Sequence, residues 1–112
     1  KKFTRREADV YSEEEIRIPQ AVLGDVISVE TVQGIKKLKI PAGTESGKVF
    51  RLKDCGVTKL RGDGFGQHFI TIKVEIPETL SKKERELFRA LAAEEGITLQ
   101  EEKGFLKKII GE

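Results

Sequence analysis

Apolar and polar residues alternate along several short stretches of this chain, which predicts a structure built mainly from β-strands. The clearest case is the segment from residue 38 to residue 52. Leu38 and Ile40 alternate with lysines, and Phe50 and Leu52 resume the alternation further on. Between them, Pro41 and two glycines interrupt the pattern, since proline lacks a backbone donor and glycine favours turns. We therefore predict two short strands joined by a turn-rich connection.

The same alternation predicts further strands elsewhere in the chain, at residues 3–6, 10–18, 25–32, 35–40 and 70–76. In the third of these, Ile27, Val29 and Thr31 share one face, and Gln33-Gly34 then makes a tight reversal that predicts an antiparallel hairpin. The strand at 10–18 is interrupted by Ser12-Glu13-Glu14-Glu15. We interpret this acidic run as a solvated strand edge or bulge, with a peptide-contacting lip as the alternative. Three consecutive acids also discourage pairing between strand edges.

Two helices are predicted. A single turn over Gln20–Leu23 follows Pro19, which suits the first turn of a helix, and Gly24 stops it. The longer helix begins after Ser81, because Glu84 stands three residues on and completes a capping box, and Gly96 ends it. Its apolar stripe, which we expect to lie on the sheet, comprises Leu87, Phe88, Leu91 and Ala92.

The end of the chain carries four large apolar residues in one short turn. Helical spacing places Phe105 over Ile109 and Leu106 over Ile110, and glycines bound the turn on both sides. The turn cannot bury these side chains by itself. They can fold back on the parent sheet or hold two copies of the chain together.

Composition and charge narrow the classes of function. The chain has 112 residues, with 21 basic and 19 acidic residues and a net charge of +2, so bulk charge gives no support to nucleic-acid binding. No apolar run approaches the roughly 18 residues of a membrane span. The single cysteine excludes an internal disulfide and fits a reducing compartment, so we expect a cytoplasmic protein. Because the chain begins Lys1-Lys2-Phe3 without Met, we expect it to be a piece of a longer protein.

The residues that could carry chemistry are few. Cys55 and His68 are the only cysteine and histidine, whereas a metal site needs three or four ligands. The glycine run at 62–66 precedes a strand and not a helix, so it is interpreted as a turn and not as a phosphate-binding loop. A hydrolase would need a nucleophile elbow or a spaced carboxylate pair, and neither is evident. We therefore expect no metal, no cofactor and no catalysis.

The amino-acid sequence of these segments resembles that of the second C-terminal β-subdomain in the DnaJ family of J-domain co-chaperones. The run IPAGTESGKVFRL resembles K-x-P-x-G-T-x-x-G-x-x-x-R-L, and QAVLG resembles the family's short helix. Phe3, Arg5, Asp9 and Tyr11 stand at family spacing before it. The family pattern continues after the run IPAGTESGKVFRL with Gly56-Val57, then a G-x-G, then VEIP. The chain departs from the family at Gln67, where an Asp is expected.

The resemblance implies a small two-sheet β-sandwich-like subdomain over residues 1–80, a C-terminal helix over 81–96 packed on the sheet, and a dimerisation tail over 97–112. It implies a domain that binds unfolded polypeptides and delivers them to a heat-shock ATPase chaperone. The family contacts that ATPase through a J-domain with an HPD motif, which this chain lacks, as it lacks the zinc domain of some members. The family's dimer contact lies at the C-terminus, which favours a homodimer held by Phe105, Leu106, Ile109 and Ile110.

The resemblance also indicates where a peptide could bind. The family's principal pocket lies on a preceding subdomain, on strands that flank its short helix. If this subdomain is a structural repeat of the preceding one, the corresponding weak site here comprises Ser12 and Glu14 before the helix, and Val29 and Thr31 after it. Core packing is the alternative for Val29, as for Ile16 and Ile18. The rival to a chaperone domain is a generic β-sandwich interaction module, which would show no preference for unfolded chains.

Overall fold

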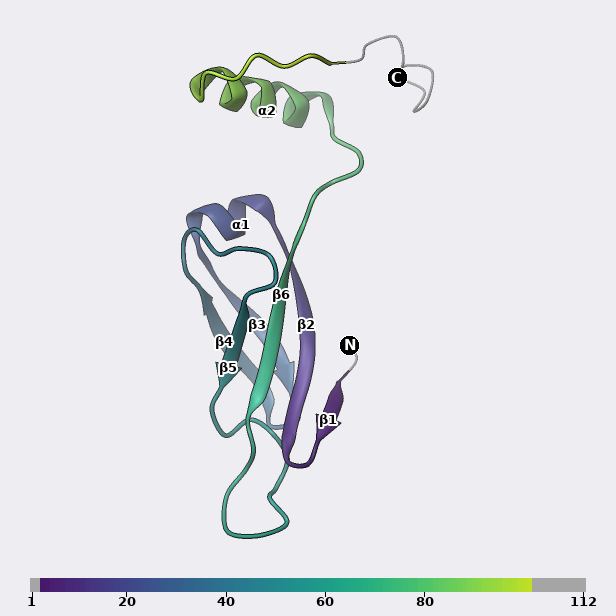
Figure 1. Cartoon of the computed structure of the whole chain (residues 1–112), viewed down its shortest axis with the longest axis vertical. Helices are drawn as coiled ribbons and strands as arrows, with labels where there is room; N and C mark the ends of the chain where they lie inside the picture. Colours follow the sequence, from purple (N-terminus) through teal and green to yellow (C-terminus); the bar gives the residue numbers. More distant parts are fainter. Residues whose placement is uncertain (1–2, 102–112) are drawn as a thin grey trace. The chain divides into compact units, whose positions relative to one another are not determined.

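The computed structural model describes residues 3–101, which divide after Ile76 into two units, residues 3–76 and residues 77–101 (Figure 1). The first unit holds all the described strands and a short helix, and the second holds one helix. In chain order the elements are β1 (Thr4–Arg6), β2 (Asp9–Arg17), α1 (Ile18–Leu23), β3 (Asp25–Thr31), β4 (Gly34–Ile40), β5 (Val49–Leu52), β6 (His68–Glu75) and α2 (Lys82–Glu94).

The strands of the first unit form two sheets. The larger sheet has the order β1-β2-β6-β5, and β3 and β4 form a separate two-stranded hairpin that lies behind it in the view of Figure 1. The pair β2–β6 is parallel, with Val10 opposite His68 and Arg17 opposite Glu75, whereas the other pairs are antiparallel. The predicted fold class, mainly β with two sheets and a short helix, is confirmed.

The core lies between the sheets because each contributes alternate apolar side chains. Ile70 and Ile72 on the central strand β6 are 0% exposed, and Leu38 and Ile40 face them from the hairpin sheet. The complete buried cluster comprises Ile16, Ala21, Val29, Leu38, Ile40, Ile70 and Ile72. The period-two pattern along β3, β4 and β6 therefore predicted the buried face correctly.

The acidic run does not interrupt the second strand, so that part of the prediction is wrong. β2 runs unbroken for nine residues, and its parallel ladder with β6 continues from Val10 to Arg17. Glu13 and Glu15 alternate outward and stay exposed, while Ile16 turns inward and is buried. Backbone pairing to β6 does not depend on the side chains, so charged residues on the outer face leave the strand intact. The strand ends at Arg17, because Ile18 already belongs to α1.

The turn-rich connection from Pro41 to Lys48 carries the chain from the hairpin sheet to the larger sheet. The Gly43 and Thr44 N–H groups donate to the Ala21 carbonyl at the end of α1, at 2.8 and 2.9 Å. Further on, the Gly47 N–H donates to the Ile72 carbonyl at 2.7 Å. The connection therefore ties α1 to β6, and β4 and β5 belong to different sheets.

The loop between β5 and β6 is pinned against the turn that joins β1 and β2. The Val57 N–H donates to the Ala8 carbonyl at 2.9 Å, and the Gly66 N–H donates to the Val57 carbonyl at 2.9 Å. A Cβ placed on Gly66 would lie 2.2 Å from the Ala8 oxygen, so only glycine fits there. The Asp9 carboxylate accepts from the Gln67 N–H at 2.7 Å, so a carboxylate from β2 holds the turn at Gln67, where the resemblance leads one to expect an Asp.

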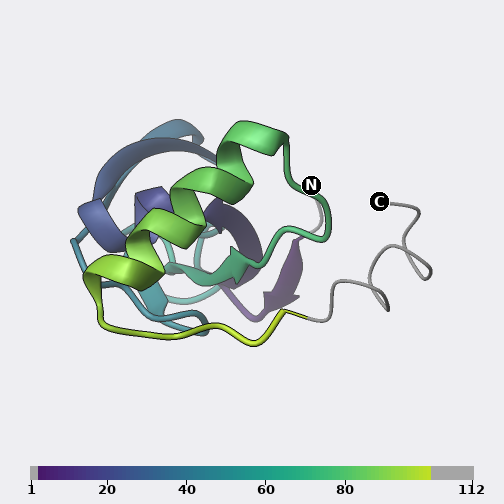
Figure 2. The same ribbon diagram turned by 90° about the horizontal axis from the view of Figure 1, so that it is seen from above.

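In the second unit, α2 is a single helix followed by an extended stretch (Figure 2). The Ser81 hydroxyl accepts from the Glu84 N–H at 3.0 Å, and the Ser81 N–H donates to the Glu84 carboxylate at 2.8 Å, which confirms the predicted capping box. Arg89 also forms an ion pair with Glu101 at 2.9 Å. Leu87 and Leu91 of the apolar stripe are exposed, so contact between this stripe and the sheet stays a prediction.

Candidate peptide-binding groove

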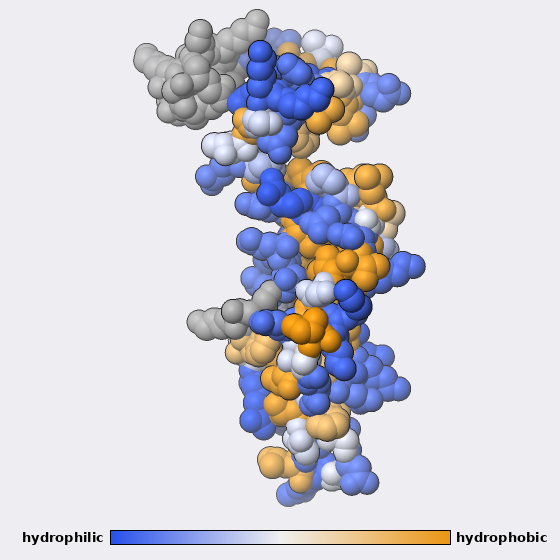
Figure 3. All heavy atoms as spheres, turned by 180° about the vertical axis from the view of Figure 1, so that it is seen from behind, coloured by the Kyte–Doolittle hydropathy of each residue, from blue (hydrophilic) through white to orange (hydrophobic). Residues whose placement is uncertain are grey.

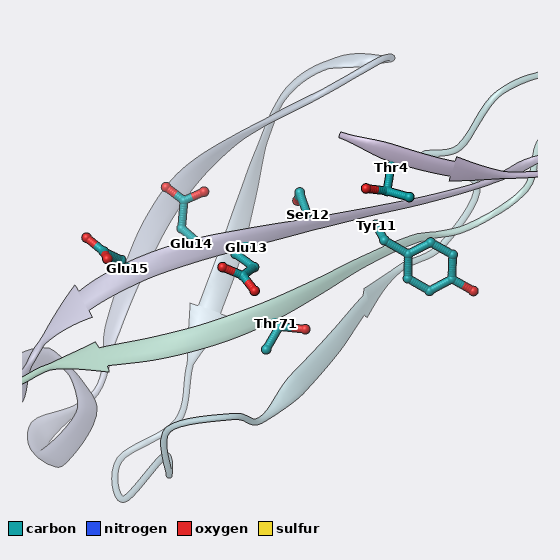
Figure 4. A pocket seen from close by; sticks show the side chains of 7 residues that line it. All are labelled: Thr4, Tyr11, Ser12, Glu13, Glu14, Glu15 and Thr71. Atoms are coloured by element: carbon teal, nitrogen blue, oxygen red, sulfur yellow. The ribbon is translucent and has the colours of Figure 1, made fainter. Parts of the chain in front are cut away.

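A groove of about 680 Å³ runs along the outer edge of β2 (Figure 4). It lies beyond the pair formed by Thr4, the first residue of β1, and Tyr11, where β2 continues towards α1. The groove is lined by Thr4, Tyr11, Ser12, Glu13, Glu14, Glu15 and Thr71. We call this surface the β2 groove.

The β2 groove exposes backbone groups of a strand edge. β1 covers β2 only as far as Tyr11, and among residues 3–101 no other strand pairs with this side of β2. On the opposite side, the Val10 N–H donates to the Gln67 carbonyl at 2.8 Å, so even-numbered residues direct their backbone groups to β6. Alternation then directs the N–H and C=O groups of Glu13 and Glu15 into the groove. The next outward donor, the Arg17 N–H, is taken by the Gln20 side chain at 2.7 Å.

The side chains of β2 divide between two faces. Tyr11 and Glu13 point to one side of the strand, and Ser12 and Glu14 point to the other (Figure 4). Tyr11 stacks on Phe69 with 5.2 Å between ring centroids and remains 38% exposed. The groove thus combines an aromatic wall with carboxylates.

Beneath the groove, Ser12 is anchored by a buried histidine. The Ser12 hydroxyl lies 2.7 Å from Nε2 of His68, and Phe3 meets the imidazole edge-on with ring centroids 5.4 Å apart. His68 is 0% exposed, and burial lowers the pKa of its imidazole, which favours the neutral ring. Nδ1 has no hydrogen-bond partner within the described part of the chain. A tautomer with the proton on Nε2 leaves only an acceptor unpaired, so Nε2 donating to Ser12 is the less costly arrangement.

The structure brings together two of the four predicted peptide contacts. Ser12 and Glu14 both line the β2 groove. Val29 is 2% exposed and packs in the core, and Thr31 is 8% exposed, with its hydroxyl donating to the Gly34 carbonyl at 2.8 Å. Both lie on β3 in the other sheet. Their role as peptide contacts stays a prediction that burial does not favour, and core packing was the stated alternative for Val29.

Sequence reasoning missed most of the other residues of the groove. Glu13 and Glu15 were noted only as part of an acidic run, and Tyr11 only as a family match. The alternation of 11, 13 and 15 could have indicated one outward face. Thr4 and Thr71 carried no comparable signal, because their place depends on which strands neighbour β2.

Other predicted sites lie outside the groove. The four tail residues Phe105, Leu106, Ile109 and Ile110 fall outside the described residues, so the dimer contact stays a prediction. Across residues 3–101, no three potential metal-ligating side chains cluster together. On the face seen in Figure 3, patches of hydrophobic residues alternate with hydrophilic ones.

Within the same described range, no helix is long and apolar enough to span a lipid bilayer.

Residues 3–76 thus form a small β domain with a four-stranded sheet, a two-stranded hairpin and one short helix. The family model for the DnaJ C terminal domain matches residues 1–77. The chain therefore belongs to the DnaJ C-terminal domain family.

Curated relatives extend the similarity beyond the β domain. The chain is 48% identical over 102 residues to the "Chaperone protein DnaJ" of Lysinibacillus sphaericus, covering 91% of this chain and 27% of that protein. It is 41% identical over 107 residues to the protein of the same name from Methanothermobacter thermautotrophicus, covering 96% of this chain and 28% of the relative. The chain thus spans about a quarter of the length of these relatives.

Proposed function

We propose that this chain is a polypeptide-binding part of a DnaJ-type co-chaperone, which holds non-native chains and passes them to a heat-shock ATPase chaperone. Membership of the family and relatives named as DnaJ chaperones support the class of function. The observation that carries the binding role is the β2 groove, because the backbone groups of Glu13 and Glu15 are directed to a side of β2 where no strand within residues 3–101 pairs with them.

In this proposal an extended segment of the client lies beside β2 as an added strand. It pairs with the N–H and C=O groups of Glu13 and Glu15. These bonds use the client's backbone, so they tolerate many sequences. A folded protein has already paired most of its backbone groups, whereas an unfolded chain presents them, and this difference gives a preference for non-native clients.

Binding by a single groove is expected to be weak. Four backbone hydrogen bonds contribute a gross free energy of about 2–6 kcal/mol, against an association cost of about 4–15 kcal/mol. Contacts with Tyr11 add apolar area, but one half-exposed ring closes little of the difference. A homodimer held by the C-terminal tail would present two grooves to one client and raise the affinity through effective concentration.

Delivery to the ATPase is assigned to the parent protein and not to this chain alone. The family's J-domain makes that contact, and no HPD motif occurs among these 112 residues. We therefore expect the isolated chain to bind clients without stimulating ATP hydrolysis.

The binding role is tested by the aggregation of a chemically denatured client, followed by light scattering with and without the chain. Glu13→Pro removes an outward N–H from the β2 edge without removing a bond to β6, and we expect it to abolish protection. Glu78→Pro is the matched control, since Glu78 is exposed and lies outside the strands and helices. Circular dichroism confirms that both variants are folded.

Three results would count against the proposal. A wild-type chain that gives no protection removes the chaperone role. Full protection by a folded Glu13→Pro variant removes the β2 edge as the binding surface. Equal binding of native and denatured client would instead indicate a generic interaction module.

A further inference from the structure

A small finger, residues 57–66, stands out from the loop that joins β5 to β6, below the strands in the view of Figure 1. Thr58 pairs with Phe65 across the finger, and the Lys59 N–H donates to the Gly64 carbonyl at 3.1 Å. These backbone contacts hold the two sides of the finger together. The side chains near its tip are therefore presented from a fixed frame.

A cavity of about 660 Å³ lies between the finger and the turn that joins β1 to β2. Its charged side chains come from both walls. Arg5, Glu7 and Asp9 belong to the hairpin of β1 and β2, and Lys59 and Arg61 belong to the finger. We call this space the finger cavity. It shares no lining residue with the β2 groove.

The basic side chains of the finger cavity are not neutralised within the domain. Across residues 3–101, no ion pair engages Arg5, Lys59 or Arg61. The Arg5 Nε donates to the Glu7 carbonyl oxygen at 2.6 Å, which holds the guanidinium at the β1–β2 turn. That contact is to a neutral backbone group, so the charge of Arg5 stays available to a ligand.

The two acidic side chains lie away from the tip of the finger. The Asp9 carboxylate is engaged at the base of the finger, where it accepts from the Gln67 N–H at 2.7 Å. Glu7 belongs to the β1–β2 turn on the opposite wall. Lys59 and Arg61 are both exposed. The finger side of the cavity is therefore positively charged.

A large apolar side chain stands between the two cations of the finger. Leu60 is 94% exposed, more than any other large apolar residue of the described chain, and it lines the finger cavity. A single exposed leucine needs no explanation by itself. Here, however, unpaired cations precede and follow it in the sequence. The finger thus offers one apolar contact and two cationic contacts side by side.

We infer that the finger cavity is a docking surface for an acidic segment of a partner polypeptide. An aliphatic residue of that segment packs on Leu60, and Asp or Glu on either side of it faces Lys59 and Arg61. Arg5 on the opposite wall supplies a further contact, since a guanidinium can bind a carboxylate through two parallel hydrogen bonds. A nucleic acid fits less well, because it has no aliphatic side chain to cover the leucine and its phosphates would approach the acidic wall.

The expected preference is modest and sensitive to salt. Two exposed ion pairs correspond to about a two- to thirty-fold gain in affinity over neutral partners. Because both finger cations are exposed, added salt should reduce the gain, as the Debye length falls from about 10 Å at 0.1 M to about 3 Å at 1 M.

The test is an NMR titration of the intact 112-residue chain, following the backbone amide shifts of Leu60 and Gln67. One peptide has a Glu-Leu-Glu centre flanked by Ser and Gly. A second has Lys in place of Glu, and a third has Ser in place of Leu. A single-stranded oligothymidylate serves as the fourth probe.

The chain offers a matched pair of double variants. Lys59→Gln with Arg61→Gln removes the two cations of the finger at exposed positions. Lys82→Gln with Lys83→Gln makes the same change in net charge at two exposed positions at the start of α2. We expect the finger variant to lower affinity for the Glu-Leu-Glu peptide about two- to thirty-fold and the α2 variant to leave it unchanged.

Each outcome has a separate meaning. Preference for the Glu-Leu-Glu peptide that disappears in the finger variant alone supports the inference. Equal binding of the lysine peptide overturns it, and so does equal binding of the peptide without leucine, since charge alone would then suffice. An oligonucleotide that binds the finger more tightly than the peptide also overturns it, as does the absence of any shift at Leu60 and Gln67. None of these results bears on the proposed function, which is tested at the β2 groove.

Discussion

The contact between the β5–β6 loop and the β1–β2 turn gives the sharpest stability prediction, through Gly66→Ala. A Cβ at this position would lie 2.2 Å from the Ala8 oxygen and 2.4 Å from the Ala8 carbonyl carbon. Both atoms belong to the backbone, so no side-chain rotation relieves the overlap. The two segments must separate, which strains the Gly66-to-Val57 and Val57-to-Ala8 hydrogen bonds, both 2.9 Å long.

The magnitude follows from these contacts. Overpacking costs about 1–3 kcal/mol, and each lost hydrogen bond costs about 0.5–1.5 kcal/mol, so the free energy of unfolding should fall by about 2–6 kcal/mol. Replacing glycine also restricts the unfolded chain, which offsets about 0.4–1 kcal/mol. The net loss corresponds to a decrease in Tm of about 4–8 °C for each kcal/mol.

The measurement is urea unfolding followed by tyrosine fluorescence. Tyr11 is the only tyrosine and the chain has no tryptophan, so the signal reports on the first unit alone. Gly62→Ala serves as the control, because Gly62 has a φ of +77° but nothing within 4 Å of an added Cβ. That variant bears only the conformational penalty of about 1–2 kcal/mol. If Gly66→Ala proves no more destabilising than Gly62→Ala, the steric reasoning is wrong.

Three further predictions concern the core, the buried histidine and the tail. Ile72→Ala should lower the free energy of unfolding by about 2–5 kcal/mol. Ile76→Ala, at a position that is 72% exposed, should change it by under about 0.5 kcal/mol. Urea unfolding compares the two variants, and equal losses of stability would contradict the assigned core. Burial lowers the pKa of His68 below its usual 6.5, so the unfolded chain binds the proton more readily and stability should fall as the pH drops below 6.5 until the folded pKa is passed. The free energy of unfolding should change by at most about 1.4 kcal/mol per pH unit. Urea unfolding at several pH values should show a weaker dependence on pH in His68→Gln. An unchanged dependence would mean that another group titrates. Removing everything after Lys103 should convert a dimer into a folded monomer in sedimentation equilibrium, and a truncated chain that still dimerises would rule out the tail.

Local patterns predicted the elements well, because local physics decides them. Ser81 and Glu84 form both bonds of the capping box, which confirms the start of α2. The hairpin follows the predicted alternation, with Ile27 opposite Leu38 and Thr31 opposite Gly34 at the turn. Such features depend on residues a few positions apart, so they can be predicted from local sequence patterns.

The β2 groove could be predicted only in part, because it depends on which strands become neighbours. Glu13 was visible as a charged residue, but the outward direction of its backbone groups follows from the parallel pairing of β2 with β6. Val29 shows the other side of this dependence: the resemblance indicated a peptide contact with core packing as the alternative, and its strand turns that side chain into the core. No local sequence pattern predicted which distant strands would pair.

The parallel pairing of β2 with β6 also has a consequence for how the domain is made. Ser12 and His68 are hydrogen-bonded although 56 residues separate them, so the first long strand must wait for the last one. Ile70 and Ile72, the fully buried side chains of the central strand, are among the last residues of this unit to leave the ribosome. Until they emerge, the edge of β2 that pairs with β6 has no partner, and the apolar face of β2 is uncovered. Such non-local topologies fold slowly and expose aggregation-prone surface meanwhile. A domain proposed to protect unfolded chains is thus expected to pass through an interval of synthesis in which it needs the same protection.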